Sequence, residues 1–189
     1  MKLVTNSNNI NTLKLLICGN VSKAKLEVAF TAPAKVKPDE RTLDETVKAC
    51  FQDSKETLPV LEVPGCTLFV PVAACQYILE SGNALSSLRA EDESWLHWES
   101  SVLYPLVLSL LSKVTDQTIL QQIKAAMGRL EEVTNKQEFL GGSSLHLTDI
   151  LIWCDLYPLL TDNKVKKELI TLTALNRWFE RIAQNPSVI

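Results

Sequence analysis

The chain has 189 residues and a mass of 21.1 kDa, a length that corresponds to one or two domains. Hydrophobic residues make up 46% of it and charged residues 22%, a composition that can form a core and that excludes a disordered or collagen-like chain. The net charge of −3 argues against a protein whose main role is to neutralise nucleic-acid phosphates.

The sequence carries no signal of export, membrane insertion or metal binding. Its amino terminus turns polar after Val4, before the apolar core of a signal peptide could form. The most apolar later stretch, 103–111, is far shorter than the about 20 residues that a membrane-spanning helix needs. The five cysteines have no C-x-x-C spacing, and two histidines supply few ligands for zinc. We therefore expect a cytoplasmic protein with reduced thiols, no metal and no membrane partner.

Strand-like and helix-like patterns alternate through the first half of the sequence. Residues 2–5 and 25–30 alternate in polarity as strands do, and residues 10–18 between them predict a helix that ends at Gly19-Asn20. This order is that of a β-α-β unit, in which the two strands are parallel.

Residues 31–57 interrupt that pattern. Prolines and scattered charges predict a surface insertion there, with one short helix over 43–51. A hairpin is expected over 58–70, because a proline-glycine turn separates two apolar runs, and a helix is expected over 72–79.

From residue 91 onward only helical patterns remain. Helices are expected over 91–113, with a bend near Pro105, and over 116–134, 147–160 and 172–184. The sequence therefore predicts a small α/β domain over 1–82, a linker over 83–90 and an all-helical domain over 91–189.

This order of elements resembles the glutathione transferase (GST) fold, an α+β architecture. In that fold a thioredoxin-like α/β N-terminal subdomain is followed by an all-α C-terminal subdomain. Pro59 matches the family's cis proline at the start of the third strand, and residues 139–142 and 145–150 resemble its loop and capping box before a buried helix. The resemblance therefore implies a cis Leu58–Pro59 bond.

Two segments resemble more narrowly the N-terminal GST-like domain appended to animal cytoplasmic methionyl-tRNA synthetases, namely 95–99 and 148–162. This resemblance implies a non-catalytic docking module of a longer polypeptide. Its partners would be GST-like domains of other synthetases or scaffold proteins in a multi-synthetase complex. The ligase's His-Ile-Gly-His and Lys-Met-Ser-Lys-Ser signatures are absent from this sequence, so we expect no cofactor here and ATP only in the parent ligase.

A working glutathione transferase is the alternative that the fold raises. Its thiol-activating residue would be Ser7, although serines in Asn-rich turns are usually turn residues. The family's Gln/Glu-Ser pair, which holds the γ-glutamyl group of glutathione, corresponds here to Val70 and Pro71, which lack the side-chain groups for that task. We therefore expect no glutathione binding. Another GST-like adaptor of the translation machinery, such as an elongation-factor or valyl-synthetase appendage, stays open.

The resemblance also implies where a partner would bind. The usual dimer surface of the fold combines the helix after the fourth strand, which carries Gln76 and Glu80, with the first helix of the helical domain, near Arg89, Trp95 and Trp98. The two tryptophans are three residues apart and share a helix face, so we expect one to point inward and one to lie near the interface. Charge reversal at Glu80 together with Arg89 should weaken association without lowering the melting temperature.

Other chemically distinctive residues have ordinary explanations. Cys66 and Cys75 have no histidine close in sequence to activate a thiolate. His97 could be a pH-sensitive interface group, but an exposed helix residue is the simpler interpretation. A tRNA contact through the parent enzyme would use three lysines, but such a group without aromatic neighbours is more typical of a solvated helix end: Lys164, Lys166 and Lys167.

The buried helix near residue 147 has half of a capping box. The acid of the box, Asp149, is in place, but His146 occupies the cap position where Ser or Thr is usual. From the sequence alone, His146→Ser should stabilise the protein by ~0.5–1 kcal/mol, and Asp149→Ala should cost at least as much.

Overall fold

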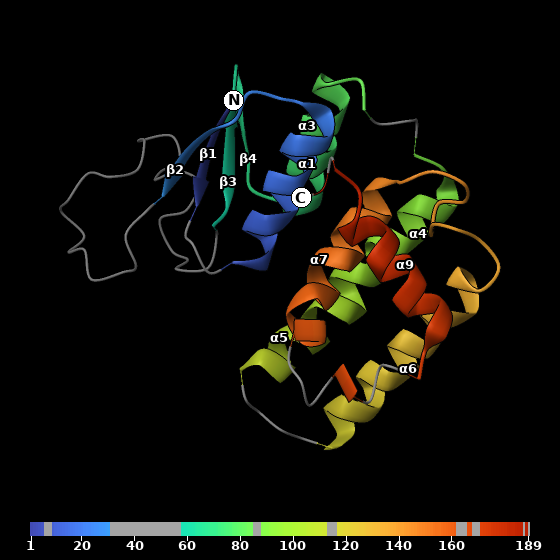
Figure 1. The fold of residues 1–189 in the computed structure, drawn as a ribbon. Helices are drawn as coiled ribbons and strands as arrows, with labels where there is room; N and C mark the ends of the chain where they lie inside the picture. The colour runs from blue at the N-terminus through green and yellow to red at the C-terminus, as the bar shows by residue number, and fades with distance from the viewer. Residues whose placement is uncertain are drawn as a thin grey trace. The chain divides into compact units, whose positions relative to one another are not determined.

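The computed structural model of the protein describes residues 1–5, 9–30, 58–84, 88–112, 117–161, 166–167, 171–186 and 188. The chain forms two compact units, Met1–Ala84 and Leu85–Ile189. The first is a small α/β unit and the second is all-helical, as predicted (Figure 1). The predicted insertion over 31–57, with its helix over 43–51, lies outside the described residues.

The first unit contains a mixed four-stranded sheet with the strand order β2-β1-β3-β4. Its strands are β1 (Lys2–Thr5), β2 (Glu27–Phe30), β3 (Val60–Val63) and β4 (Cys66–Leu68). β1 pairs with β2 in parallel, and β3 pairs with both β1 and β4 in antiparallel fashion. The predicted β-α-β unit and hairpin are therefore confirmed. The hairpin turns at Gly65, whose φ of 86° favours glycine.

Two helices, α1 (Ile10–Ser22) and α3 (Pro71–Ser81), pack against each other on one face of the sheet (Figure 1). The core between sheet and helices consists of buried aliphatic side chains, among them Leu3, Leu15, Leu61, Ile78 and Leu79. The Leu58–Pro59 peptide bond at the entry to β3 is cis, as the resemblance implied. The Asn9 side chain donates to the Leu58 carbonyl oxygen at 2.6 Å and accepts from the Asn11 amide at 2.8 Å, so it joins this turn to the start of α1.

The predicted end of the first helix at Gly19-Asn20 is wrong, because α1 continues to Ser22. Gly19 is buried, and a Cβ atom there would collide with the Leu26 side chain. The glycine therefore permits close packing and does not stop the helix. The helix closes at Lys23, whose φ of 55° is left-handed and whose amide bonds the Asn20 carbonyl at 3.2 Å.

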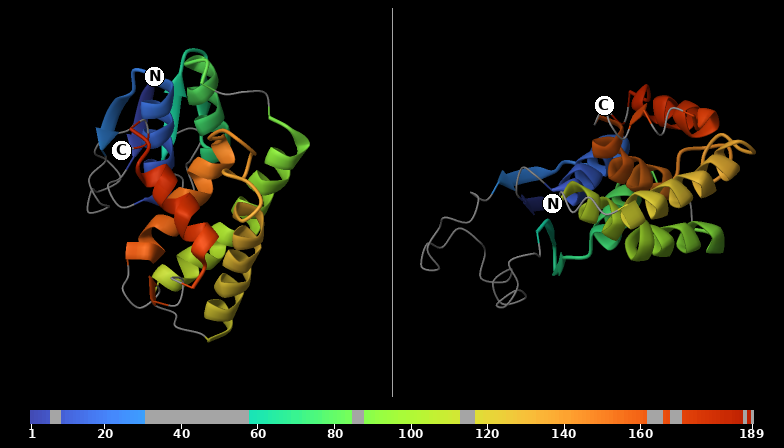
Figure 2. Two further views of the ribbon diagram at one scale, coloured as in Figure 1. Left: turned by 45° about the vertical axis from the view of Figure 1, so that its right-hand side comes forward. Right: turned by 90° about the horizontal axis from the view of Figure 1, so that it is seen from below.

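The second unit is built from helices that surround one apolar helix. The central apolar helix is α7 (Leu147–Thr161). The others are α4 (Ala90–Trp98), the π-helical turn η1 (Glu99–Leu103), α5 (Tyr104–Leu111), α6 (Gln117–Thr134) and α9 (Thr173–Ala183). α7 packs against α4, η1, α5 and α9, and its side chains are buried on all sides from residue 147 to 156 (Figure 2). The bend expected at Pro105 takes the form of η1, which lies directly before α5 and its early proline.

The last helix is capped by a side chain from another helix. The N-cap residue of α9, Leu172, offers no capping side chain. Instead, the two carboxylate oxygens of Glu131 on α6 accept the amides of Ala174 at 3.1 Å and Leu175 at 2.6 Å. A carboxylate at this end of a helix satisfies free N–H groups and complements the helix dipole. Glu131 therefore caps the N-terminal end of α9 and holds that end against α6.

We predict that Glu131→Ala lowers the free energy of unfolding by about 1–3 kcal/mol, because it leaves two helix amides without their acceptor. The neighbouring exposed Glu132 is the matched control, and Glu132→Ala should change stability by less than about 0.5 kcal/mol. Urea denaturation of the whole chain measures both. Equal stability of the two variants would show that Glu131 does not cap α9.

Candidate interaction surface

The helix α3 presents two of the predicted interface residues to solvent. Its inner side is buried at Ala74, Cys75 and Ile78, among others, whereas Gln76 is half-buried and Glu80 exposed. The Gln76 side-chain amide donates to the Glu80 carboxylate at 3.0 Å across one helical turn. This pair forms a polar patch on the outer side of α3.

The two tryptophans of α4 lie at different depths in the second unit. Trp95 is buried, with 7% exposure, and Trp98 is half-buried. Their rings meet edge to face with centroids 5.3 Å apart. The guanidinium carbon of Arg129, on α6, lies 5.3 Å from the Trp95 ring centroid and 5.7 Å from that of Trp98. This cation–π contact ties α4 to α6 at the surface.

A groove of about 520 Å³ runs beside Trp98, between the η1–α5 segment and α6. Small and apolar side chains line most of it, and Arg129 lines it as well. Val102, on its wall, is a large aliphatic residue with 40% exposure. The sequence indicated Trp98 but not the groove, because the residues of α6 come from a distant part of the chain.

Arg89 has a structural role, which corrects the expectation that its charge could be reversed without loss of stability. Its backbone amide and its Nε both donate to the Asp92 carboxylate, at 3.0 and 3.2 Å. A terminal nitrogen of its guanidinium donates to the Gly141 carbonyl oxygen at 2.5 Å. Arg89 thereby holds the start of α4 against the loop before α7, so we expect its charge reversal to lower the melting temperature.

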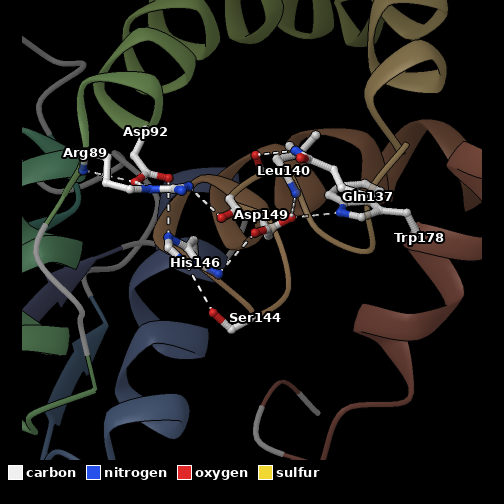
Figure 3. Close-up of polar contacts among 9 residues, drawn as sticks. Arg89, Asp92, Gln137, Leu140, Ser144, His146, Asp149 and Trp178 are labelled. Carbon is white, nitrogen blue, oxygen red and sulfur yellow. Dashed lines mark hydrogen bonds and ion pairs between the residues drawn. The ribbon is translucent and has the colours of Figure 1, made fainter. Parts of the chain in front are cut away.

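The Asp149 carboxylate, near the start of α7, organises the other side of this loop (Figure 3). One oxygen accepts the Leu140 amide at 2.7 Å and the Trp178 indole N–H at 2.8 Å, and the other accepts the His146 amide at 3.0 Å. Asp149 is fully buried. Burial raises the pKa of its carboxyl above the ordinary value, while the donated hydrogen bonds oppose that rise.

His146 is the residue before α7, as predicted, but its ring does more than replace a capping serine. Its Nδ1 lies 3.3 Å from a carboxylate oxygen of the buried Asp92, and its Nε2 lies 3.2 Å from the Ser144 hydroxyl (Figure 3). A side chain at Gly141 would collide with this ring. The structure thus connects Arg89, Asp92, His146 and Asp149 into one polar network that the sequence did not predict.

The remaining candidates are placed as follows. Val70 is the N-cap residue of α3 and Pro71 is its first residue, and no side chain caps this helix. Cys75 is buried, Cys66 is exposed on β4, and His97 is exposed on α4. Lys166 and Lys167 are exposed, and two further candidates lie outside the described residues: Ser7 and Lys164. Within the part of the chain that the structure describes, no helix has the length and apolar character needed to cross a bilayer.

The chain is similar in sequence to a segment of much longer proteins. It is 30% identical over 140 residues to the cytoplasmic methionine–tRNA ligases of Xenopus laevis and Homo sapiens. That match covers 69% of this chain but only 15% of each ligase. A probable elongation factor 1-gamma of Caenorhabditis elegans is 26% identical over 115 residues, which cover 54% of this chain and 28% of that protein. No protein-family model matches the chain.

Solved structures confirm the predicted fold. Glutathione transferase F7 from Populus trichocarpa superposes with a TM-score of 0.80 and 19% identity, over 99% of this chain and 95% of that one. The bacterial GST BphK, solved as a ternary complex, gives a TM-score of 0.79 and 19% identity, over 100% and 96% of the two chains. The chain therefore has the GST fold.

We predict that Asp149→Ala lowers the free energy of unfolding by about 3 kcal/mol or more, because it leaves two buried N–H groups and the half-buried His146 amide without an acceptor. His146→Ser should not stabilise the protein, since the gain of a serine cap is offset by the lost contact between the ring and Asp92. His146→Ala, which loses the ring and gains no cap, is the control and should be the less stable of the two. Chemical denaturation that found His146→Ser more stable than the wild type would contradict this account.

Proposed function

The chain has the GST fold and is similar to one segment of cytoplasmic methionine–tRNA ligases, and from this we propose that it is a non-catalytic docking module of such a ligase. The observation that carries the proposal is the ligase similarity over 69% of the chain in a fold whose glutathione-binding pair is replaced. The partners would be GST-like domains of other synthetases or scaffold proteins in a multi-synthetase complex of the cytoplasm. ATP and tRNA would be handled by the rest of the ligase.

The start of α3 supports a module without glutathione chemistry. In working transferases a Gln/Glu-Ser pair at this position holds the γ-glutamyl group, whereas here Val70 has no hydrogen-bonding side chain and Pro71 has no N–H. Val70 is 48% exposed, so an apolar surface stands where those ligands would be. An apolar side chain there favours contact with a protein over contact with a charged peptide group.

Two sites on the protein surface support docking. On α3 the polar pair Gln76 and Glu80 can fix the register of a partner, and on α4 the half-buried Trp98 can anchor it. Tryptophan is enriched among the residues that dominate binding energy at interfaces, where a standard interface buries about 800 Å² per partner. Arg89 is also exposed, but its guanidinium bonds Asp92 and the Gly141 carbonyl within its own unit, so its charge is less available to a partner.

The similarity to a probable elongation factor 1-gamma supports a second candidate, a GST-like adaptor of another translation protein. The two candidates share the docking function and differ in the parent polypeptide. The sequence of the gene beyond these residues distinguishes them, because only a ligase would carry the two nucleotide-binding signatures.

Binding to GST-like domains of synthetases and scaffold proteins from the same organism tests the proposal. In analytical ultracentrifugation we expect a one-to-one complex with at least one of them, and Glu80→Lys should weaken it by about tenfold without lowering the melting temperature. Glu180→Lys on α9 makes the same charge change elsewhere and is the matched control.

Three results would contradict the proposal. They are the absence of any complex, retention of the chain on immobilised glutathione with conjugating activity, and loss of binding through Glu180→Lys alone, which would place the interface on α9.

A further inference from the structure

The groove beside Trp98 has few polar groups available to a ligand. Two hydroxyls on its wall already donate to carbonyls of their own helix, Ser101 to His97 at 2.6 Å and Ser109 to Pro105 at 2.9 Å. The rest of that wall is apolar, and it includes Val102, Pro105 and Leu106. The α6 wall adds one uncharged polar side chain, Gln122, so apolar groups fit chiefly along the η1–α5 wall.

Arg129 gives the groove a single charge of defined position. Its guanidinium is held by the two tryptophan rings, at 5.3 and 5.7 Å, and no carboxylate of the described residues forms an ion pair with it. A ring contact leaves the N–H groups of the guanidinium free to donate. A carboxylate that reached this end of the groove would receive a charge-assisted hydrogen bond without displacing an existing partner.

The shape of the groove favours a protein segment as its occupant. Sites for small molecules enclose most of the ligand surface, whereas several lining residues here stand on open helix surface, such as Val102 and Ala125. Short side chains on both walls, such as Ser101, Ala125 and Ala126, let another backbone come close.

We propose that the groove between η1–α5 and α6 binds an amphipathic acidic segment of a partner protein, with apolar side chains along Val102 and Leu106 and a carboxylate on Arg129. This inference rests on the proposed docking function and adds the chemistry of the partner. It also identifies Arg129, which the sequence did not indicate, as the residue that selects an acidic partner. A basic segment would place like charges together and be rejected.

Selection from a phage-displayed library of random twelve-residue peptides, with the whole chain as target, tests the inference. We expect enriched peptides to combine aspartate or glutamate with bulky apolar residues. Arg129→Glu should weaken their binding by about tenfold or more, and Arg129→Lys by less, because it keeps the charge. Lys136→Glu, at an exposed lysine that does not line the groove, is the matched charge control and should leave binding unchanged.

A second variant distinguishes loss of the binding surface from loss of the folded structure. Val102→Asp changes an exposed wall residue and should also weaken binding about tenfold while the circular dichroism spectrum stays that of the wild type. Enrichment of basic peptides, enrichment of none, or equal affinity for wild type and Arg129→Glu would overturn the inference. Binding of decanoate, a small amphipathic carboxylate, in the groove without binding of any peptide would also overturn the inference. The peptide experiments do not test the complex with GST-like domains, which is measured separately. Absence of peptide binding in the groove would therefore not count against the docking proposal.

Discussion

The helical unit depends on one buried carboxylate. Asp149 accepts hydrogen bonds from the Leu140 amide in the loop before α7, from the His146 amide directly before α7, and from the Trp178 indole on α9. Burial of a charge is costly unless donors surround it, and burial here raises the pKa of the carboxyl in spite of three of them. Because the amide of His146 is held, its ring stands next to Asp92, and Asp92 in turn holds Arg89 at the start of α4. One polar network thus joins residues 89 to 178 around the apolar α7.

This arrangement separates the polar groups that hold the unit together from those that can meet another molecule. Arg89, Asp92, His146 and Asp149 are engaged with one another and with backbone groups, as Figure 3 shows, and of the four only the Arg89 side chain is largely exposed. The groups that remain for a partner are on the surface: the Gln76–Glu80 pair, Trp98 and the guanidinium of Arg129. A fold used elsewhere for glutathione chemistry therefore serves here, on our proposal, to present docking surfaces to a partner.

The sequence predicted what depends on local pattern and missed what depends on contacts between distant residues. The parallel strands, the hairpin and the helix after His146 follow from periodicity and turn residues, and the structure has all three. Gly19 suggested a helix end because glycine usually acts there, but the Leu26 side chain, seven residues later, determines its role. The capping of α9 by Glu131 and the ring contacts of Arg129 join residues more than 30 positions apart, and no local pattern encodes them. Arg89 had a detectable signal, since an aspartate three residues into a helix is typical of a cap.

Hydrogen exchange of the chain, free and bound to a GST-like partner domain, tests most directly whether binding uses the surfaces and not the internal network. Our account predicts slower exchange on binding over α3 and over residues 98–109 and 122–129. The amides held by Asp149 and Glu131, at Leu140, His146, Ala174 and Leu175, should exchange at the same rate in both states. Protection that appeared instead over residues 176–184 of the last helix, with none over α3, 98–109 or 122–129, would contradict it.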